Sequence, residues 1–220
     1  MKTLQKFGGF SAFFMALSHL VGIVIFLAVL NFAGITDPAQ KLAVNMDNQM
    51  LVFSTNLMMY VIFGFALILL SLALHDRLKN GAPGLMQTAT AVGIIWAGSL
   101  IASGMVANAG LASVGMLYAK DPAQAALVWQ GIEAVANGLG NANGEILGGL
   151  WVLLVSTAAL RGGGLPKALN TLGLLVGVAG ILSLAPALTE MLVGLFGVGQ
   201  MVWFVWTGIA LLRAQPESSE

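Results

Sequence analysis

The 220-residue chain is 58% hydrophobic and only 8% charged, its nine lysines and arginines balance nine acids, and it contains no cysteine. A soluble domain typically carries about 25% charged residues, so this composition excludes an ordinary soluble globular protein. The zero net charge gives no sign of a nucleic-acid partner, and the lack of cysteine excludes disulfides, thiolate nucleophiles and cysteine-ligated metal centres.

Long stretches without a charged side chain follow one another along the chain. A helix needs about 20 apolar residues to cross the roughly 30 Å hydrocarbon core of a bilayer, and most of these stretches have that length. The fourth stretch reaches it only if its helix includes Glu145 and the residues just before it. The sequence therefore predicts an all-α, polytopic membrane protein, a single transmembrane domain over residues 1–220 with six transmembrane helices in an antiparallel bundle. The predicted spans are approximately 9–33, 50–74, 86–116, 142–161, 168–187 and 191–212.

The connections after the first and third spans both begin with Asp-Pro-Ala-Gln, at residues 37–40 and 121–124. Asp is a favoured N-cap and Pro suits the first helical turn, so we expect amphipathic outer-face helices at approximately 38–48 and 122–138. The repeat is explained either by an internal duplication or by two helices that start in the same way. The expected apolar face of the second outer helix consists of Ala125, Val128, Ile132, Val135 and Leu139.

The distribution of cations predicts the orientation of the bundle. Positive charges concentrate in cytoplasmic segments of membrane proteins, and placing both termini in the cytoplasm satisfies this rule at every loop. Only Lys41 and Lys120 then lie outside. The cytoplasmic cations are Lys2, Lys6, Arg77, Lys79, Arg161, Lys167 and Arg213.

The third predicted span is rich in Gly, Ala and Ser, which let neighbouring helix backbones approach closely. This pattern is typical of a central, tightly packed helix, and also of a helix that lines a cavity or hinge. The pairs Gly173 with Gly177 and Gly194 with Gly197 predict helix packing or a homo-oligomer contact through small-residue faces.

His19 and His75 lie on the first two spans and invite a haem or metal interpretation. His19 is about 15 Å inside its apolar run, whereas His75 is at the membrane interface, so a shared ligand would require badly shifted helices. We therefore expect neither haem nor a metal site. We expect His19 to be a neutral buried imidazole bonded to a neighbouring helix, and His75 to be an interfacial loop residue.

Glu145 is the main candidate for a binding residue. It lies either one turn inside the fourth helix, where a carboxylate must face protein, partner or water, or at an exposed helix N-terminus if that helix begins at Gly144 or later. The first placement predicts a polar outer vestibule that binds a ligand. Its expected members are Glu145, Glu133, Asn137, Asn141 and Asn143.

Other polar and aromatic side chains lie within the predicted spans. The intramembrane polar residues are His19, Asn56, Asn108 and Gln200. Such uncharged groups more often form interhelical hydrogen bonds than bind ligands. The tryptophans of the spans either pack the helices or stack on a lipid, carotenoid or quinone; they are Trp96, Trp151, Trp203 and Trp206.

Three segments carry a family resemblance: residues 4–12 (LQKFGGFSA), 148–161, and 165–177, which opens with LPKALN. They are similar to an uncharacterised family of small bacterial six-helix integral membrane proteins, a domain of unknown function. The resemblance implies six helices and the bacterial cytoplasmic (inner) membrane. It implies no activity and therefore no catalytic residues.

The sequence contains no phosphate-binding loop, nucleophile elbow, HExxH motif or catalytic Ser/Lys arrangement, so no catalytic residue and no cofactor are predicted. We expect a binding or accessory membrane protein that holds a lipid-like or other hydrophobic ligand, or a partner subunit. A small-solute transporter or channel is the first alternative. A membrane-embedded enzyme or redox protein is the second.

Overall fold

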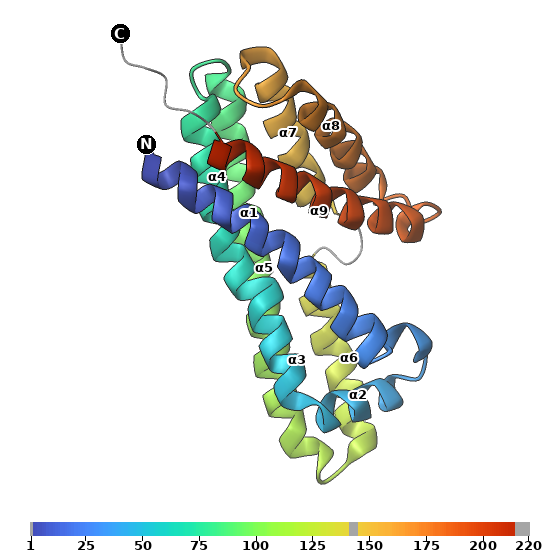
Figure 1. Ribbon diagram of the computed structural model, residues 1–220. Coiled ribbons are helices and arrows are strands. Elements are labelled where there is room, and N and C mark those ends of the chain that lie inside the picture. The colour runs from blue at the N-terminus through green and yellow to red at the C-terminus, as the bar shows by residue number, and fades with distance from the viewer. Residues whose placement is uncertain (1, 141–144, 214–220) are drawn as a thin grey trace. The chain divides into compact units, whose positions relative to one another are not determined.

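The computed structural model describes residues 2–140 and 145–213, and in this part the chain is helical throughout, without strands (Figure 1). The all-α prediction is confirmed. The helices in chain order are α1 (Lys2–Ile23), α2 (Pro38–Asp47), α3 (Gln49–Asn56), α4 (Phe63–Leu78), α5 (Pro83–Tyr118), α6 (Pro122–Leu139), α7 (Ile146–Gly162), α8 (Lys167–Leu182) and α9 (Thr189–Arg213). Two π-helical segments, η1 (Val24–Val29) and η3 (Leu57–Ile62), and a 3₁₀ turn, η2 (Phe32–Gly34), join some of them.

Four continuous helical segments are long and apolar enough to cross a bilayer. They are Thr3–Val29, Gln49–Leu78, Pro83–Tyr118 and Thr189–Arg213. Helices α7 and α8 are also apolar but have only 17 and 16 residues, near the lower limit for a span. The chain therefore has the character of a membrane protein, while the count of six spans stays a prediction.

Several helices end close to the predicted boundaries, and two end clearly earlier. Helix α8 was expected to reach residue 187, but it stops at Leu182. The first apolar helix was expected to reach residue 33, but its π-helical end η1 stops at Val29. Asn31 then adopts a left-handed conformation with φ of 51°, which a helix does not continue through. The two π-helical segments had no signal in the apolar pattern.

The chain forms two compact units, which are described separately. Unit 1 comprises Met1–Leu17, Gly64–Ala97 and Asn143–Glu220, and unit 2 comprises Ser18–Phe63 and Gly98–Ala142. Unit 1 thus contains α4, α7, α8 and α9 with the first parts of α1 and α5. The prediction of a single transmembrane domain is not tested by this division.

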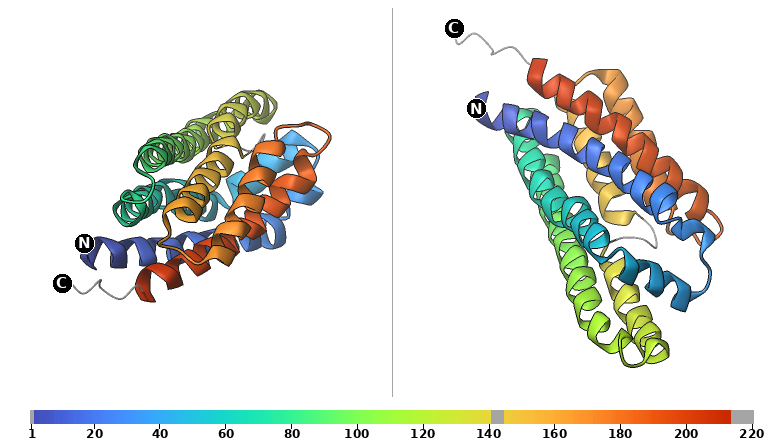
Figure 2. Two further views of the ribbon diagram at one scale, coloured as in Figure 1. Left: turned by 90° about the horizontal axis from the view of Figure 1, so that it is seen from above. Right: turned by 60° about the horizontal axis from the view of Figure 1, so that its bottom comes forward.

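The core of unit 1 is aromatic. Trp151 of α7 is fully buried and meets the ring of Trp203 of α9 edge-on, with centroids 5.5 Å apart. Trp96 and Phe204 complete this cluster. Figure 2 shows α8 in orange beside α7 and α9. The tryptophans were expected either to pack the helices or to stack on a ligand. Trp96, Trp151 and Trp203 are buried and pack the helices.

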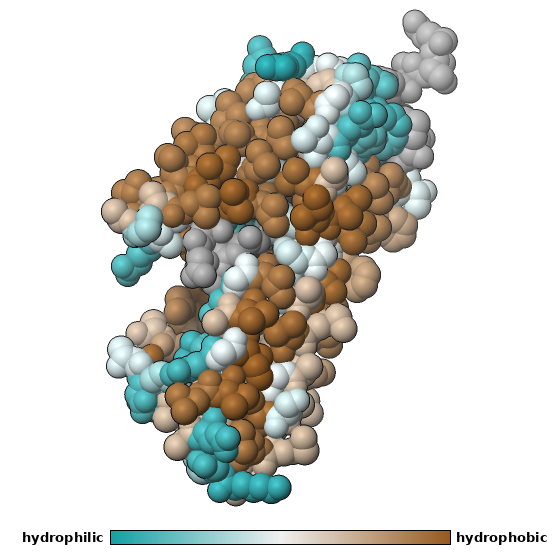
Figure 3. Space-filling view, turned by 180° about the vertical axis from the view of Figure 1, so that it is seen from behind, coloured by the Kyte–Doolittle hydropathy of each residue, from teal (hydrophilic) through white to brown (hydrophobic). Residues whose placement is uncertain are grey.

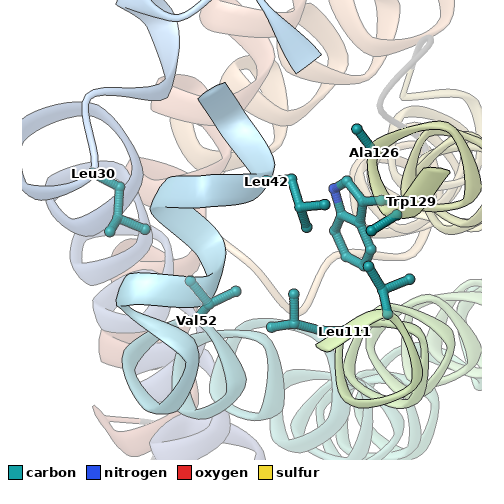
Figure 4. Close-up of a cluster of buried hydrophobic side chains, with 8 residues drawn as sticks. Leu30, Leu42, Val52, Leu111, Ala126 and Trp129 are labelled. Atoms are coloured by element: carbon teal, nitrogen blue, oxygen red, sulfur yellow. The ribbon is translucent and has the colours of Figure 1, made fainter. Parts of the chain in front are cut away.

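The core of unit 2 joins α2, α3, α5 and α6 (Figure 4). Trp129 of α6 points toward Leu42 of α2, and both side chains are buried. The two outer helices begin as predicted: the Asp37 carboxylate accepts hydrogen bonds from the backbone of α2, and the Asp121 carboxylate accepts one from Gln124 N at 3.0 Å. Lys41 Nζ lies 2.7 Å from Glu133 Oε1, so an ion pair also ties α2 to α6.

The predicted apolar face of α6 is buried only in part: Ala125 lies in the core and Ile132 packs against it. The expected apolar face included Val128 and Val135, and the structure leaves both exposed. The residues that α6 buries are Ala125, Ala126, Trp129 and Ala136. The large indole of Trp129 removes more apolar area from solvent than either valine, and this decides how α6 turns toward α2 and α5.

Large apolar side chains remain exposed on many helices, and Figure 3 shows brown apolar side chains covering much of one face. A contiguous exposed apolar surface of this kind marks a membrane or protein contact. For helices that are apolar on several sides, lipid is the environment that accepts such a surface.

Candidate functional site

A pocket of about 300 Å³ lies in unit 1 at the ends of α4 and α9. Its walls come from three parts of the chain: α4, the connection between α7 and α8, and α9. The lining residues are Arg77, Pro166, Trp206, Ile209, Ala210 and Arg213. The pocket thus combines an apolar wall with two guanidinium-bearing side chains.

Helix α9 supplies most of the wall because of its spacing. Trp206, Ile209, Ala210 and Arg213 stand at i, i+3, i+4 and i+7, which places them on one face of the helix. This face differs from the fully buried face of α9 that carries Trp203 and Thr207. Arg213 lies in the last turn of α9, where the helix dipole favours a cation.

Arg77 reaches the pocket from the last turn of α4, and its Nε donates a hydrogen bond to the carbonyl oxygen of Gly164 at 2.7 Å. Gly163 and Gly164 have φ values of 79° and 93°, a backbone conformation that suits glycine. The tight turn between α7 and α8 therefore presents its carbonyl to Arg77 and sets Pro166 against the pocket. In this way the loop orients the guanidinium.

The charge of the pocket is positive. An arginine side chain stays protonated at any physiological pH. The neighbouring acid, Asp76, is engaged elsewhere, because its Oδ1 accepts a hydrogen bond from Lys79 Nζ at 2.8 Å. No acidic side chain is among the described residues that line the pocket. Such a site suits a ligand that is anionic at one end and apolar at the other.

This pocket was not predicted from the sequence. Arg77 and Arg213 were interpreted only as topology signals, because the positive-inside rule accounts for cations at helix ends. The one signal available was the spacing of Trp206, Ile209, Ala210 and Arg213 on α9. That the end of α4 meets this face is a property of the tertiary structure.

Glu145 is the N-cap residue of α7, which begins at Ile146. This start agrees with the second predicted placement, in which Glu145 stands at the N-terminus of the helix. The side chain is half-buried, however, and not exposed as that placement expected. Its backbone N–H donates a hydrogen bond to Ser183 Oγ at 2.9 Å. Burial raises the pKa of the Glu145 carboxyl from its ordinary value of 4.5 to about 8.

Of the other members of the predicted vestibule, the two that the structure describes lie in unit 2. Glu133 belongs to unit 2 and pairs with Lys41, and Asn137 is exposed on α6 in the same unit. Asn141 and Asn143 lie outside the described residues. A vestibule that joins these residues to Glu145 in unit 1 stays a prediction.

Asn56 and Asn108 form the interhelical hydrogen bond that the sequence favoured. Asn56 Nδ2 donates to Asn108 Oδ1 at 3.1 Å, and Asn108 Nδ2 donates to the carbonyl oxygen of Phe53 at 3.2 Å. Both amides are more than 90% buried. His19, also in unit 2, is half-buried and meets the ring of Phe63 edge-on at 5.2 Å.

Gln200 has a different environment in the core of unit 1. Its side chain is fully buried, and within the described part of the chain neither its amide oxygen nor its nitrogen has a hydrogen-bond partner. Several other buried polar atoms of unit 1 share this condition among the described residues. They belong to Ser71, Trp151, Ser156, Trp203 and Thr207. Unpaired amides and hydroxyls are costly to bury, so this core is polar beyond the needs of packing.

His75 was expected to be an interfacial loop residue, and this is wrong. It lies in the last turn of α4, with Nδ1 3.0 Å from Thr90 Oγ1 and 3.3 Å from Met86 O. The reason is that α4 continues through the charged residues to Leu78. Among the described residues, no group of three or more His, Asp or Glu side chains is placed to hold a metal ion.

No protein-family model, no curated protein and no solved structure matches the chain. The resemblance to an uncharacterised bacterial membrane family therefore stays a prediction, and the functional argument depends on the geometry of the molecule.

Proposed function

We propose that the chain is a six-helix protein of the bacterial cytoplasmic (inner) membrane that holds a lipid-like ligand, acting as a binding or accessory membrane protein. The single observation that carries the proposal is the pocket that two arginines line together with Trp206, Ile209, Ala210 and Pro166. Its apolar residues suit hydrocarbon, and its cations suit a polar headgroup.

The proposed spans are α1 with η1, α3 with η3 and α4, α5, α7, α8 and α9. Helices α7 and α8 cover about 25 Å each at 1.5 Å per residue, which is near the lower limit for crossing the hydrocarbon core. Both termini are proposed to be cytoplasmic because the cations at the ends of α4, α7 and α9 then share one side. The pocket would lie at this cytoplasmic boundary.

The surface of α9 supports a ligand with hydrocarbon chains. Val202, Val205 and Leu212 are exposed on α9, at positions adjoining those of Trp206 and Ile209 along the helix. An acyl chain lying there would continue from the apolar wall of the pocket into the surrounding lipid. A pocket of about 300 Å³ is at the lower end of ligand-site volumes, so it suits part of a lipid and not the whole molecule.

The experiment is to purify the protein in mild detergent and measure co-purified amphiphiles by native mass spectrometry. Ala210→Trp fills the pocket, and Val198→Trp adds the same side chain to an exposed position of α9 that does not line it. We expect wild type and Val198→Trp to retain a lipid in fixed stoichiometry and Ala210→Trp to lose it. Retention by all three proteins, or by none, would contradict the proposed function.

A small-solute transporter or channel is a second candidate, favoured by the unpaired polar atoms in the core of unit 1. Gln200 is central to it, because a buried amide without partners is where a polar solute would exchange hydrogen bonds. The test is solute or water flux into proteoliposomes. Flux that Gln200→Leu abolishes, with the protein still folded, would support transport, and the absence of flux in wild type would remove this candidate.

A further inference from the structure

We propose that the pocket between α4 and α9 binds the phosphate of an anionic phospholipid headgroup, with Arg77 and Arg213 as the phosphate-binding residues. This inference rests on the proposed function and deepens it, because it names the class of ligand. Two arginines from separate elements, Arg77 of α4 and Arg213 of α9, line the same pocket. An arginine that served only to interact with the dipole of its own helix end would not need a second arginine from another element beside it.

The geometry of Arg77 favours phosphate recognition. The guanidinium is planar, and one of its five N–H donors is held by the carbonyl oxygen of Gly164 at 2.7 Å. This bond fixes the plane of the group before a ligand arrives, which reduces the entropy lost on binding. A pre-oriented arginine is suited to the tetrahedral oxygens of a phosphate.

Arg213 supplies the second positive charge from the end of α9. It is exposed, and it stands two helical turns beyond Trp206, about 10 Å along the axis. The pocket is therefore lined by two cations together with the apolar side chains of Trp206, Ile209 and Ala210. Tryptophan at the headgroup level of a bilayer commonly has this amphipathic placement.

Charge complementarity selects an anionic lipid over a zwitterionic one. The described lining residues carry two positive charges and no negative one, so a headgroup with its own cation would bring like charges together. Basic pockets at the cytoplasmic ends of membrane helices are a recognised setting for anionic lipid headgroups. The volume of the pocket suits a headgroup, and the exposed face of α9 is left for the chains.

The test measures lipid binding to the delipidated full chain by native mass spectrometry, with phosphatidylglycerol, phosphatidylcholine and phosphate-free diacylglycerol as probes. We expect phosphatidylglycerol to bind at least about tenfold more tightly than the other two. Arg213→Gln should weaken its binding about tenfold, since one charge-assisted contact is lost. Arg161→Gln is the matched control, because Arg161 is an exposed arginine in the last turn of α7 that does not line the pocket.

Arg77 needs a second variant, because Arg77→Gln also breaks the bond to Gly164. Arg77→Lys retains the charge and loses the planar donor set, so it should bind phosphatidylglycerol more weakly than wild type while remaining folded. Inorganic phosphate is added as a competitor in a separate arm. If it displaces the lipid at equal concentration, the site is one for a free anion and the lipid inference fails.

The outcomes separate this inference from the proposed function. Equal binding of all three lipids, unaffected by Arg213→Gln, would overturn the phosphate assignment while leaving a lipid-binding protein. Binding of none of them would remove both. Selective binding of phosphatidylglycerol that is lost in Arg213→Gln and kept in Arg161→Gln would support both.

Discussion

Gly149 and Gly177 face each other where α7 crosses α8. A Cβ atom on Gly149 would lie 2.8 Å from the carbonyl oxygen of Gly177, and a Cβ atom on Gly177 would lie 2.8 Å from the carbonyl oxygen of Gly149. The two backbones are therefore in direct contact. The absence of a side chain at both positions allows this approach, as at other small-residue crossings between membrane helices.

The first prediction concerns this crossing. Gly177→Ala should lower the stability of the protein by about 1–3 kcal/mol, because the neighbouring atoms are backbone and cannot move aside as a side chain could. Thermal unfolding in detergent measures the change. Gly197→Ala is the matched control, since nothing lies within 4 Å of its added Cβ, and its melting temperature should equal or exceed that of wild type. Equal melting temperatures for wild type and Gly177→Ala would contradict the close crossing.

The second prediction concerns the amide pair in unit 2. Asn108→Leu removes the acceptor for Asn56 Nδ2 and the donor to Phe53 O, so it should destabilise the protein by about 1 kcal/mol. Ser113→Ala is a control on the same helix, because that exposed hydroxyl bonds only to Ala109 O one turn earlier. A double-mutant cycle with Asn56→Leu should show that the two losses are not additive. Additive losses would mean that the pair does not interact.

The third prediction is a pH dependence from Glu145. The folded protein holds the carboxyl proton more tightly than the unfolded chain, since burial raises the pKa from 4.5 to about 8. The protonated carboxyl therefore contributes stability in full below pH 4.5, and this contribution is lost as the pH rises to about 8. Melting temperatures measured between pH 5 and pH 8.5 should fall for wild type.

Glu145→Gln should remove most of this fall, because the amide does not titrate. Glu190→Gln changes an exposed acid in the first turn of α9 and should keep the wild-type dependence. If the curve of Glu145→Gln parallels that of wild type, another group is responsible for the pH dependence.

The fourth prediction is the topology. The chain has no cysteine, so single cysteines report their own side of the membrane. A membrane-impermeant maleimide should label Lys120→Cys in intact cells, and should label Asn80→Cys only after the membrane is opened. Both positions are exposed in the structure, so neither is protected by packing. Labelling of both in intact cells would contradict the proposed orientation.

The sequence by itself determined that the chain is helical and where the two outer helices begin. Asp37 and Asp121 cap α2 and α6 as expected, because an N-cap is a local interaction between residues a few positions apart. The long apolar helices followed from length and composition, since a bilayer requires about 20 apolar residues. Asn56 and Asn108 were expected to form interhelical hydrogen bonds, because an amide among apolar helices needs a partner, but the sequence did not show that they bond to each other.

Only the tertiary structure decided which faces of these helices meet. In a chain this apolar, most faces of a helix are hydrophobic, so periodicity does not identify the one that packs. For this reason α6 buries Trp129, which was not on the predicted apolar face, and leaves Val128 and Val135 of that face exposed. The pocket of Arg77 and Arg213 has the same origin: its two cations are far apart in the sequence, and they line one pocket only because the tertiary structure brings the glycine turn before α8 and the end of α9 to the pocket that Arg77 of α4 also lines.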